Sequence, residues 1–176
     1  MRKSISGFTI VELLIVIVVI GILASIVIVA YTGIQTQASN IKTVAAVNSW
    51  AAAIQLYRVD KGSFPPSATQ NNSCLGSTST YTNVGYGVFC WGTSYWDVDA
   101  GFLALMAPYI GNNPPEPDIT HIGGGATNRR GAFYNSTSHY IRAMFSGVST
   151  CPSSSAGPIE ATGVYYDGIW CQYSLN

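Results

Sequence analysis

The stretch from Gly7 to Tyr31, GFTIVELLIVIVVIGILASIVIVAY, decides the fold of this chain. It carries a single charge, Glu12, close to its start. As a helix, Leu13 to Tyr31 would rise about 28 Å, which matches a hydrocarbon core of about 30 Å. Arg2 and Lys3 precede the stretch, and such basic residues keep their end of a membrane helix in the cytoplasm. The sequence therefore predicts one membrane-spanning helix, with a cytoplasmic N-terminus and the rest of the chain outside.

Glu12 is the residue of this stretch that needs an explanation. An ionised side chain in an apolar membrane segment costs on the order of 2.5 to 3.5 kcal/mol at mid-helix and less near an interface, so it usually has a partner. A cut between Gly7 and Phe8 would create an α-amine that can be buried beside this carboxylate. We expect the Phe8 amine of one subunit to pair with Glu12 of its neighbour. The alternative is a slightly polar membrane anchor whose Glu12 lies among lipid headgroups.

These residues resemble the N-terminus of type IV pilins and of the pseudopilins of type II secretion. The family motif is a short basic leader, a Gly and a Phe-Thr-x-x-Glu start, and the resemblance covers Met1 to Tyr31. It implies cleavage after Gly7 by a prepilin peptidase, N-methylation of Phe8, and an assembly charge pair between Glu12 and the Phe8 amine of an adjacent subunit. A secretory signal peptide differs, because it has no acid at the start of its apolar stretch and a small-residue cleavage site after it. One departure is Val29, where many family members have a proline.

The helix is expected to continue beyond the membrane as an amphipathic segment. Residues 34–57 contain no proline, and at 100° per residue one arc is apolar while the opposite side is polar. Gly62 is expected to end this helix, with Pro65 and Pro66 preventing its resumption. The apolar arc comprises Val44, Val47, Trp50, Ala51, Ile54 and Tyr57, and the polar side comprises Lys42, Ser49 and Asp60.

Two later segments extend the resemblance at lower specificity. The helix end resembles that of major pseudopilins and related pilins, in which Tyr-x-x-Asp-x-Gly-x-aromatic-Pro recurs; here this is Tyr57 to Pro65, and Phe64 is expected to fold back on the arc. Residues 102–118, FLALMAPYIGNNPPEPD, contain a short helical pattern of Leu103, Leu105 and Met106 and loosely resemble the corresponding pseudopilin segment.

The last third of the chain is expected to form strands. Residues 139–145 alternate as in a half-buried strand, and Ala132 to Tyr134 is a further candidate. Residues 164–166 and 169–171 read as a hairpin joined by Asp167-Gly168, a strong turn signal. A small antiparallel sheet would then cover Trp50, Ile54 and Tyr57 on the helix arc.

The predicted fold is α+β and type IV pilin-like, with a protruding hydrophobic half of a long N-terminal helix and an amphipathic half packed on a small antiparallel sheet. About 115 residues after the helix suffice for one compact domain. The expected organisation is a leader peptide at 1–7, a transmembrane and filament-core helix at 8–31, an amphipathic helix at 32–61, and a head at 62–176 with an αβ-loop, the sheet and a C-terminal disulfide loop.

Four cysteines lie on the exported side, where an even number predicts disulfides. Three connectivities are open. We favour Cys74 with Cys90 and Cys151 with Cys171, because each pair closes a local loop rich in Ser, Gly and Pro. The second pair would resemble the disulfide-bounded loop of many type IV pilins. A zinc site is the rival, but the chain has no C-x-x-C pair.

Other chemistry finds little support in the sequence. Asp97 and Asp99 have a fragment of calcium-loop spacing, but the glutamate that ends an EF-hand loop is missing, so a helix-capping Asp99 is the simpler expectation. Arg129 and Arg130 could touch DNA phosphates, but two charges make a poor footprint, and a solvated loop is the better explanation. With eight basic and eight acidic residues, the chain has no net charge. We expect no active site, metal or cofactor, and nucleic-acid binding stays open.

The expected function is a structural subunit of a type IV pilus, a self-assembling surface filament for adhesion, twitching motility or DNA uptake. Before assembly the subunit would sit in the cytoplasmic membrane as a single-pass protein. The resemblance implies an assembly ATPase and an inner-membrane platform protein as partners. The first alternative is a pseudopilin of a type II secretion system, which the helix-end resemblance favours. The second is a membrane-tethered binding domain that never polymerises.

Overall fold

The computed structural model describes most of the chain from Thr9 onward. The chain divides into two compact units, Met1–Gln37 and Ala38–Asn176. Gly7 and Phe8 lie outside the described residues, so their predicted roles remain predictions. The described residues are 9–67, 71–77, 80–81, 90–92, 98–119, 128–129, 131–166 and 168–176.

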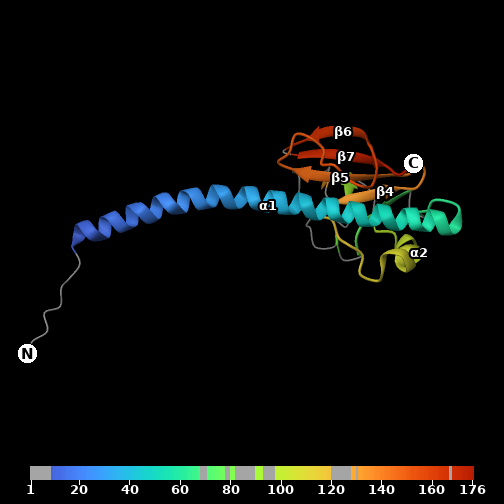
Figure 1. The fold of residues 1–176 in the computed structure, drawn as a ribbon, viewed down its shortest axis with the longest axis horizontal. Helices are drawn as coiled ribbons and strands as arrows, with labels where there is room; N and C mark the ends of the chain where they lie inside the picture. Colours follow the sequence, from blue (N-terminus) through green and yellow to red (C-terminus); the bar gives the residue numbers. More distant parts are fainter. Residues whose placement is uncertain are drawn as a thin grey trace, which may run out of the picture. The chain divides into compact units, whose positions relative to one another are not determined.

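Helix α1 runs from Ile10 to Lys61 (Figure 1). It ends as predicted, because Gly62 takes a φ of 74°, a left-handed conformation that glycine adopts at little cost. The predicted outer positions, Lys42, Ser49 and Asp60, are exposed. The predicted arc is confirmed as buried or half-buried throughout: Val44, Val47, Trp50, Ala51, Ile54 and Tyr57.

A five-stranded antiparallel sheet forms the head together with helix α2. The strand order is β1-β4-β5-β7-β6, so the β4–β5 and β6–β7 neighbours are also neighbours in sequence. Two further strands, β2 and β3, pair with each other. The bounds are β1 Asn72–Cys74, β2 Trp91–Gly92, α2 Ala100–Ile110, β3 Asn128–Arg129, β4 Ala132–Asn135, β5 Tyr140–Ser146, β6 Ile159–Tyr165 and β7 Gly168–Ser174.

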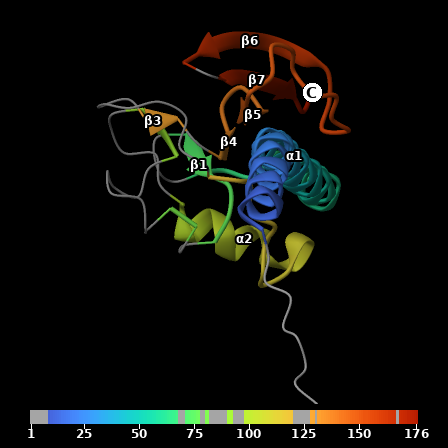
Figure 2. The same ribbon diagram turned by 90° about the vertical axis from the view of Figure 1, so that its left-hand side faces the viewer.

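The main core lies around the second half of α1, with the sheet on one side of the helix and α2 on another (Figures 1 and 2). Trp50 stacks on Phe102 of α2, with ring centroids 5.7 Å apart, and Phe102 stacks on Tyr134 of β4 at 5.5 Å. The Trp50 indole N–H donates to the carbonyl of Pro115 at 2.9 Å. Tyr57 also contacts α2, through Tyr109. The expectation that the sheet covers the arc is therefore incomplete, because α2 and the segment after it cover Trp50 and Tyr57 as well.

The segment after α1 folds back toward the core. Phe64 is half-buried and packs against the main core, as predicted. Its ring stacks on His139 at a centroid distance of 4.0 Å, and the Arg58 guanidinium lies 4.5 Å from its centroid. These contacts connect the end of α1 to the turn between β4 and β5.

The other face of the sheet carries a second cluster of buried side chains. Phe133 of β4 and Met144 of β5 pack there with Trp91. Arg142 of β5 lies among aromatic rings, with its guanidinium 4.4 Å from the Trp170 centroid, and it donates to the Gln172 side chain at 2.5 Å. Both faces of the sheet are therefore covered in part by protein.

The predicted strands are present, with one correction at the hairpin. The register pairs Tyr165 with Gly168, so residues 166 and 167 join β6 to β7 and Gly168 already belongs to β7. In this register Gly163 faces Trp170, and a Cβ at position 163 would collide with the indole. The predicted Asp167-Gly168 turn is therefore wrong by one residue, because Gly168 pairs with Tyr165, and this register places the side-chain-free Gly163 opposite the bulky Trp170.

Candidate assembly site

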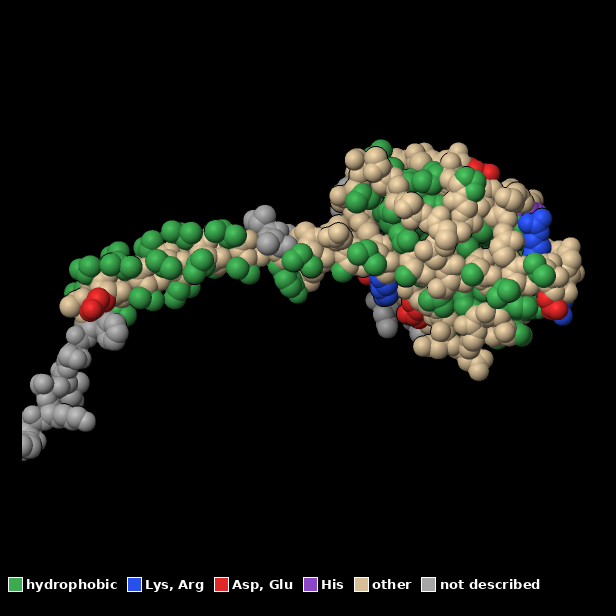
Figure 3. All heavy atoms as spheres, in the orientation of Figure 1, with side chains coloured by type: hydrophobic (Ala, Val, Ile, Leu, Met, Phe, Trp, Pro, Cys, Tyr) green, Lys and Arg blue, Asp and Glu red, His purple; other side chains and the backbone are tan. Residues whose placement is uncertain are grey.

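The N-terminal half of α1 exposes its apolar side chains. Ile10–Val27 is long and apolar enough to cross a membrane, and none of it is buried within the structure. Figure 3 shows hydrophobic side chains around this part of the helix. In water such a surface would be strongly unfavourable, at about 25 cal/mol per Å² of apolar area. This segment is therefore suited to lipid or to other apolar helices.

Glu12 lies at the start of this segment and is held by its own helix. Its Oε2 accepts hydrogen bonds from the backbone N–H and the hydroxyl of Thr9, both at 2.8 Å. The Glu12 N–H in turn donates to the Thr9 hydroxyl at 3.3 Å. With Thr9 before the first helical residue and Glu12 at its third position, this is a reciprocal capping box. It satisfies N–H groups that have no partner inside the helix.

The capping box was missed in the sequence, although its Ser/Thr-x-x-Glu signal is visible at Thr9 to Glu12. A carboxylate near a helix N-terminus is also favoured by the helix dipole. Among the residues that the structure describes, Glu12 makes its side-chain hydrogen bonds with Thr9. The predicted pairing of Glu12 with Phe8 of another subunit therefore remains a prediction.

The head carries two disulfides, and they join the pairs favoured above. Cys74 is bonded to Cys90 and Cys151 to Cys171, each with a Cα–Cα distance of 5.8 Å. All four cysteines are thereby used, which leaves no thiolate for zinc.

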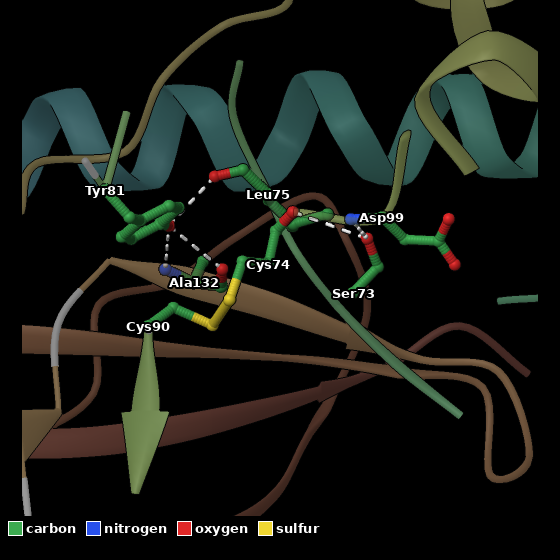
Figure 4. The surroundings of a disulfide bond; sticks show 7 residues. All are labelled: Ser73, Cys74, Leu75, Tyr81, Cys90, Asp99 and Ala132. Carbon is green, nitrogen blue, oxygen red and sulfur yellow. Dashed lines mark hydrogen bonds between the residues drawn. A yellow bond between two sulfur atoms is a disulfide. The ribbon is translucent and has the colours of Figure 1, made fainter. Parts of the chain in front are cut away.

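The Cys74–Cys90 bond lies in a tightly packed neighbourhood (Figure 4). The Tyr81 hydroxyl lies 2.9 Å from the carbonyl of Leu75 and accepts from the N–H of Ala132 at 3.4 Å. Gly131 is required beside it, since its φ is +64° and a Cβ there would collide with the Tyr81 ring. These contacts hold the loop after β1 against β4.

Asp99 connects the same region to α2. Its Oδ1 accepts from the N–H groups of Gly101 and Phe102, at 2.8 and 3.1 Å, so it is the helix cap predicted from sequence. Its Oδ2 accepts from the hydroxyl of Ser67, and its N–H donates to Ser73 of β1. One buried residue therefore joins α2, β1 and the segment after α1.

The Cys151–Cys171 bond fixes the C-terminal loop to β7. The same loop is tied to α1, because the Asn48 side-chain oxygen accepts from the hydroxyl of Ser154 at 2.6 Å and the N–H of Ser155 at 2.9 Å. Polar positions on α1 thus dock the loop.

A carboxylate on the Pro-rich segment after α2 makes a third connection. Glu116 Oε1 accepts from the hydroxyls of Ser77 at 2.5 Å and Thr80 at 2.7 Å. These hydrogen bonds, with a smaller contribution from the positive charge of Lys42, hold the pKa of Glu116 below its usual value. The segment is also fixed to α1, since the Asp118 N–H donates to Thr43.

The remaining predicted sites are placed only in part. Asp97 and Arg130 lie outside the described residues, and Arg129 is described only as a backbone position in β3. DNA contact at Arg129 and Arg130 therefore stays a prediction. Within the part of the chain that is described, no three His, Cys, Asp or Glu residues come together as a metal site would require.

The curated relatives of this chain share one name, type II secretion system core protein G. Residues 2–28 match the family model described as the prokaryotic N-terminal methylation motif. The type II secretion system core protein G of Escherichia coli K12 is 29% identical over 131 residues, which cover 66% of this chain and 90% of that protein. The proteins of the same name from Klebsiella michiganensis and Aeromonas hydrophila are 36% and 37% identical over 64 residues.

Those last two matches cover 36% of this chain and 45% of each relative, so the chain spans less than half the length of these proteins. No solved structure matches the chain. The methylation motif lies over the apolar start of α1, and the E. coli match extends well beyond it. The chain therefore matches the prokaryotic N-terminal methylation motif and is similar to type II secretion system core protein G, and its apolar N-terminal helix and α+β head form a pilin-like arrangement.

Proposed function

We propose that this chain is a pseudopilin, a structural subunit of a type II secretion machine that polymerises through α1. The similarity to core protein G of E. coli, which spans 90% of that protein, is the observation that carries this proposal. It favours the pseudopilin alternative over the surface pilus that we expected first. Adhesion, twitching motility and DNA uptake have no support among the relatives.

The proposal includes processing at the N-terminus. A prepilin peptidase cleaves after Gly7, Phe8 becomes N-methylated, and the new amine pairs with Glu12 of a neighbouring copy. The methylation motif over residues 2–28 supports these steps. The capping box is compatible with them, because it holds the Glu12 carboxylate at the start of the helix.

Assembly moves α1 from lipid into a bundle of like helices. Transfer from lipid brings little hydrophobic gain, since lipid tails are as apolar as the side chains, so close packing and the charge pair must drive association. Leaving the membrane without partners would expose each large apolar side chain at a cost of about 1.5 to 3 kcal/mol. We therefore propose that an ATPase and an inner-membrane platform protein extract the subunit directly into the growing fibre, and that copies wait in the cytoplasmic membrane until then.

Deletion of the gene tests this function. The proposal expects secretion of exoproteins into the medium to fail, and a wild-type copy to restore it. A Glu12→Gln copy is expected to give no restoration, although its head folds normally. Normal secretion in the deletion strain would contradict the proposal. Mass spectrometry of the mature chain tests processing separately, and an intact Met1 would exclude it.

A surface pilus is the second candidate. Its support is the head, where two disulfides stabilise loops for an exported and exposed protein. Shearing the cells separates the two functions: long fibres that contain this chain, with secretion intact after deletion, favour the pilus. Absence of any polymer, with normal secretion, would favour the tethered binding domain.

A further inference from the structure

The β6–β7 hairpin ends in apolar and aromatic side chains that face outward. Val164 is 80% exposed, Tyr166 is 66% exposed, and Tyr165 between them is half-buried. The rings of Tyr165 and Tyr166 meet edge to face, with their centroids 4.8 Å apart. β6 is an edge strand of the five-stranded sheet. These three residues, the hairpin tip, therefore present an apolar surface to the surroundings of the head.

Tyr166 has a backbone conformation that does not suit its side chain. Its φ is 53°, in the left-handed region, and it follows Tyr165, which pairs with Gly168 across the turn. Gly, Asn and Asp take this conformation most easily in a two-residue hairpin turn. Placing an aromatic residue here has a cost within the head, and such strain is typical of sites that make a contact elsewhere.

The hairpin tip lies at the end of the head where its part of α1 begins. The head unit starts at Ala38. Gly168, which pairs with Tyr165, also pairs with Ser146 of β5. The Ser146 carbonyl accepts from the Asn40 side chain at 2.9 Å, and the Ser146 N–H donates to the same side chain at 3.1 Å. The turn of the hairpin is therefore connected, through one strand, to the first residues of the unit.

The uncharged run of α1 ends at the same residues. Residues 13–41 contain no charged side chain, so Lys42 is the next charge after Glu12. As a helix, this run is about 44 Å long, which matches a bilayer of about 40–45 Å when its headgroup layers are included. With Glu12 at the cytoplasmic surface, we expect Asn40 to lie in the headgroup layer of the opposite surface.

We propose that the hairpin tip, Val164 to Tyr166, contacts this headgroup layer and holds the head on the membrane before assembly. The inference rests on the proposed function, in which copies wait in the cytoplasmic membrane. Tyrosine suits the layer because its ring is apolar and its hydroxyl is polar, and tyrosine is enriched at both surfaces of membranes. The chain thus has two membrane contacts, the span of α1 and the hairpin tip.

The charges beside the tip favour zwitterionic lipid headgroups. Lys42 is exposed and positive, and its charge acts on Glu116. Asp167 follows the tip in the sequence and lies outside the described residues. A carboxylate is costly in hydrocarbon, so the contact is confined to the hydrated headgroups. Because both signs of charge occur near the tip, phosphatidylcholine, which has no net charge, is the test lipid.

Dye labels along β6 of the full-length chain test this contact. The native cysteines are bonded in two disulfides, so an introduced cysteine provides the thiol for labelling. The chain is reconstituted at low density in phosphatidylcholine vesicles that contain a lipid with a nitroxide on its headgroup, which quenches nearby dyes. A dye at Val164→Cys is expected to be quenched about threefold more than one at Ile159→Cys, the control about 16 Å away on the same strand.

A second label leaves the hairpin tip free of dye. Thr162→Cys, at an exposed position of β6, is labelled in the otherwise native chain and together with Tyr166→Asn. Asparagine tolerates the left-handed turn, so this variant removes the ring and keeps the hairpin. Quenching at Thr162 is expected to fall about twofold with Tyr166→Asn, because the interfacial ring is lost. Ile159→Asn, which removes an exposed apolar side chain at the other end of β6, is the matched control and should change nothing.

Equal quenching at Val164 and Ile159 overturns the contact, and so does a Thr162 signal that ignores Tyr166→Asn. A difference between the labels that appears only when copies are crowded in the vesicles indicates a contact between copies and also overturns it. The vesicles contain no secretion machinery, so these failures leave the proposed function standing. Normal secretion in the deletion strain would contradict the proposed function, whereas the quenching result would still decide the lipid contact.

Discussion

The two halves of α1 share one conformation but differ in what covers their apolar side chains. Between Ile10 and Val27 the large side chains are exposed on all sides, whereas between Val47 and Tyr57 the apolar arc is buried against α2 and the sheet. The first half needs lipid or other copies, and the second is satisfied within its own chain. The exposed half is therefore suited to lipid or to other apolar helices, and the buried arc of the other half stabilises the head.

Among the variants considered, removal of the Trp50 ring is expected to destabilise the head most. Trp50→Ala is expected to lower the free energy of unfolding of the head by about 3 to 5 kcal/mol, because a buried ring is lost from the core. Denaturant unfolding of the full chain in detergent measures it. Leu14→Ala, in the exposed half, is the control and should leave the head unchanged. Equal losses would mean that the two halves do not differ as described.

Loss of the second disulfide is expected to have the next largest effect. The double substitution Cys151→Ser with Cys171→Ser should cost about 3 kcal/mol, because the two residues are 20 positions apart and the bond restricts the unfolded chain. Unfolding midpoints under non-reducing conditions measure it, with Ser153→Ala in the same loop as control. A loss below about 1 kcal/mol would show that the Asn48 contacts hold the loop by themselves.

The cap of α2 is expected to contribute less. Asp99→Ala should destabilise the head by about 1 kcal/mol, since the N–H groups of Gly101 and Phe102 lose their acceptor. Asp99→Asn keeps a capping side chain and is the matched control. Thermal unfolding by circular dichroism compares the variants, and equal destabilisation by Asn and Ala would argue that the charge matters more than the cap.

Glu116 is expected to give the smallest effect, and one that depends on pH. Its pKa is lowered in the folded chain by Ser77 and Thr80, so its contribution is complete above the usual value of 4.5 and is lost as the pH falls through the lowered value. Glu116→Gln should therefore cost less than about 1 kcal/mol at pH 7, and the difference from wild type should shrink below about pH 4. Unfolding at several pH values measures this, with the exposed Glu160→Gln as control. A pH-independent difference would contradict the assignment.

Elements with strong local signals were predictable. The apolar arc, the end of α1 at Gly62, the cap at Asp99 and strands β4 and β5 each follow from a spacing or residue type that acts within a few positions. The pairs Cys74–Cys90 and Cys151–Cys171 were also the ones favoured from local loop closure.

Elements that depend on distant partners were not predictable. Strand β1, Asn72–Cys74, has no apolar alternation, and it is buried because it pairs with β4 and because Ser73 contacts Asp99. Glu116 meets Ser77 and Thr80 across nearly 40 residues. No local pattern indicates such contacts.

By itself, the sequence determined an apolar helix with one acid at its start, a second amphipathic half and a head with two disulfides. Periodicity, hydropathy and charge depend on residues that are close together in the chain, so these features can be predicted from the sequence alone. The tertiary structure alone decided that α2 shares the cover of Trp50 and that β6 and β7 pair in the register that places Gly163 opposite Trp170. These outcomes depend on how segments far apart in the chain pack in space, where volume and shape select one arrangement among several that the pattern allows.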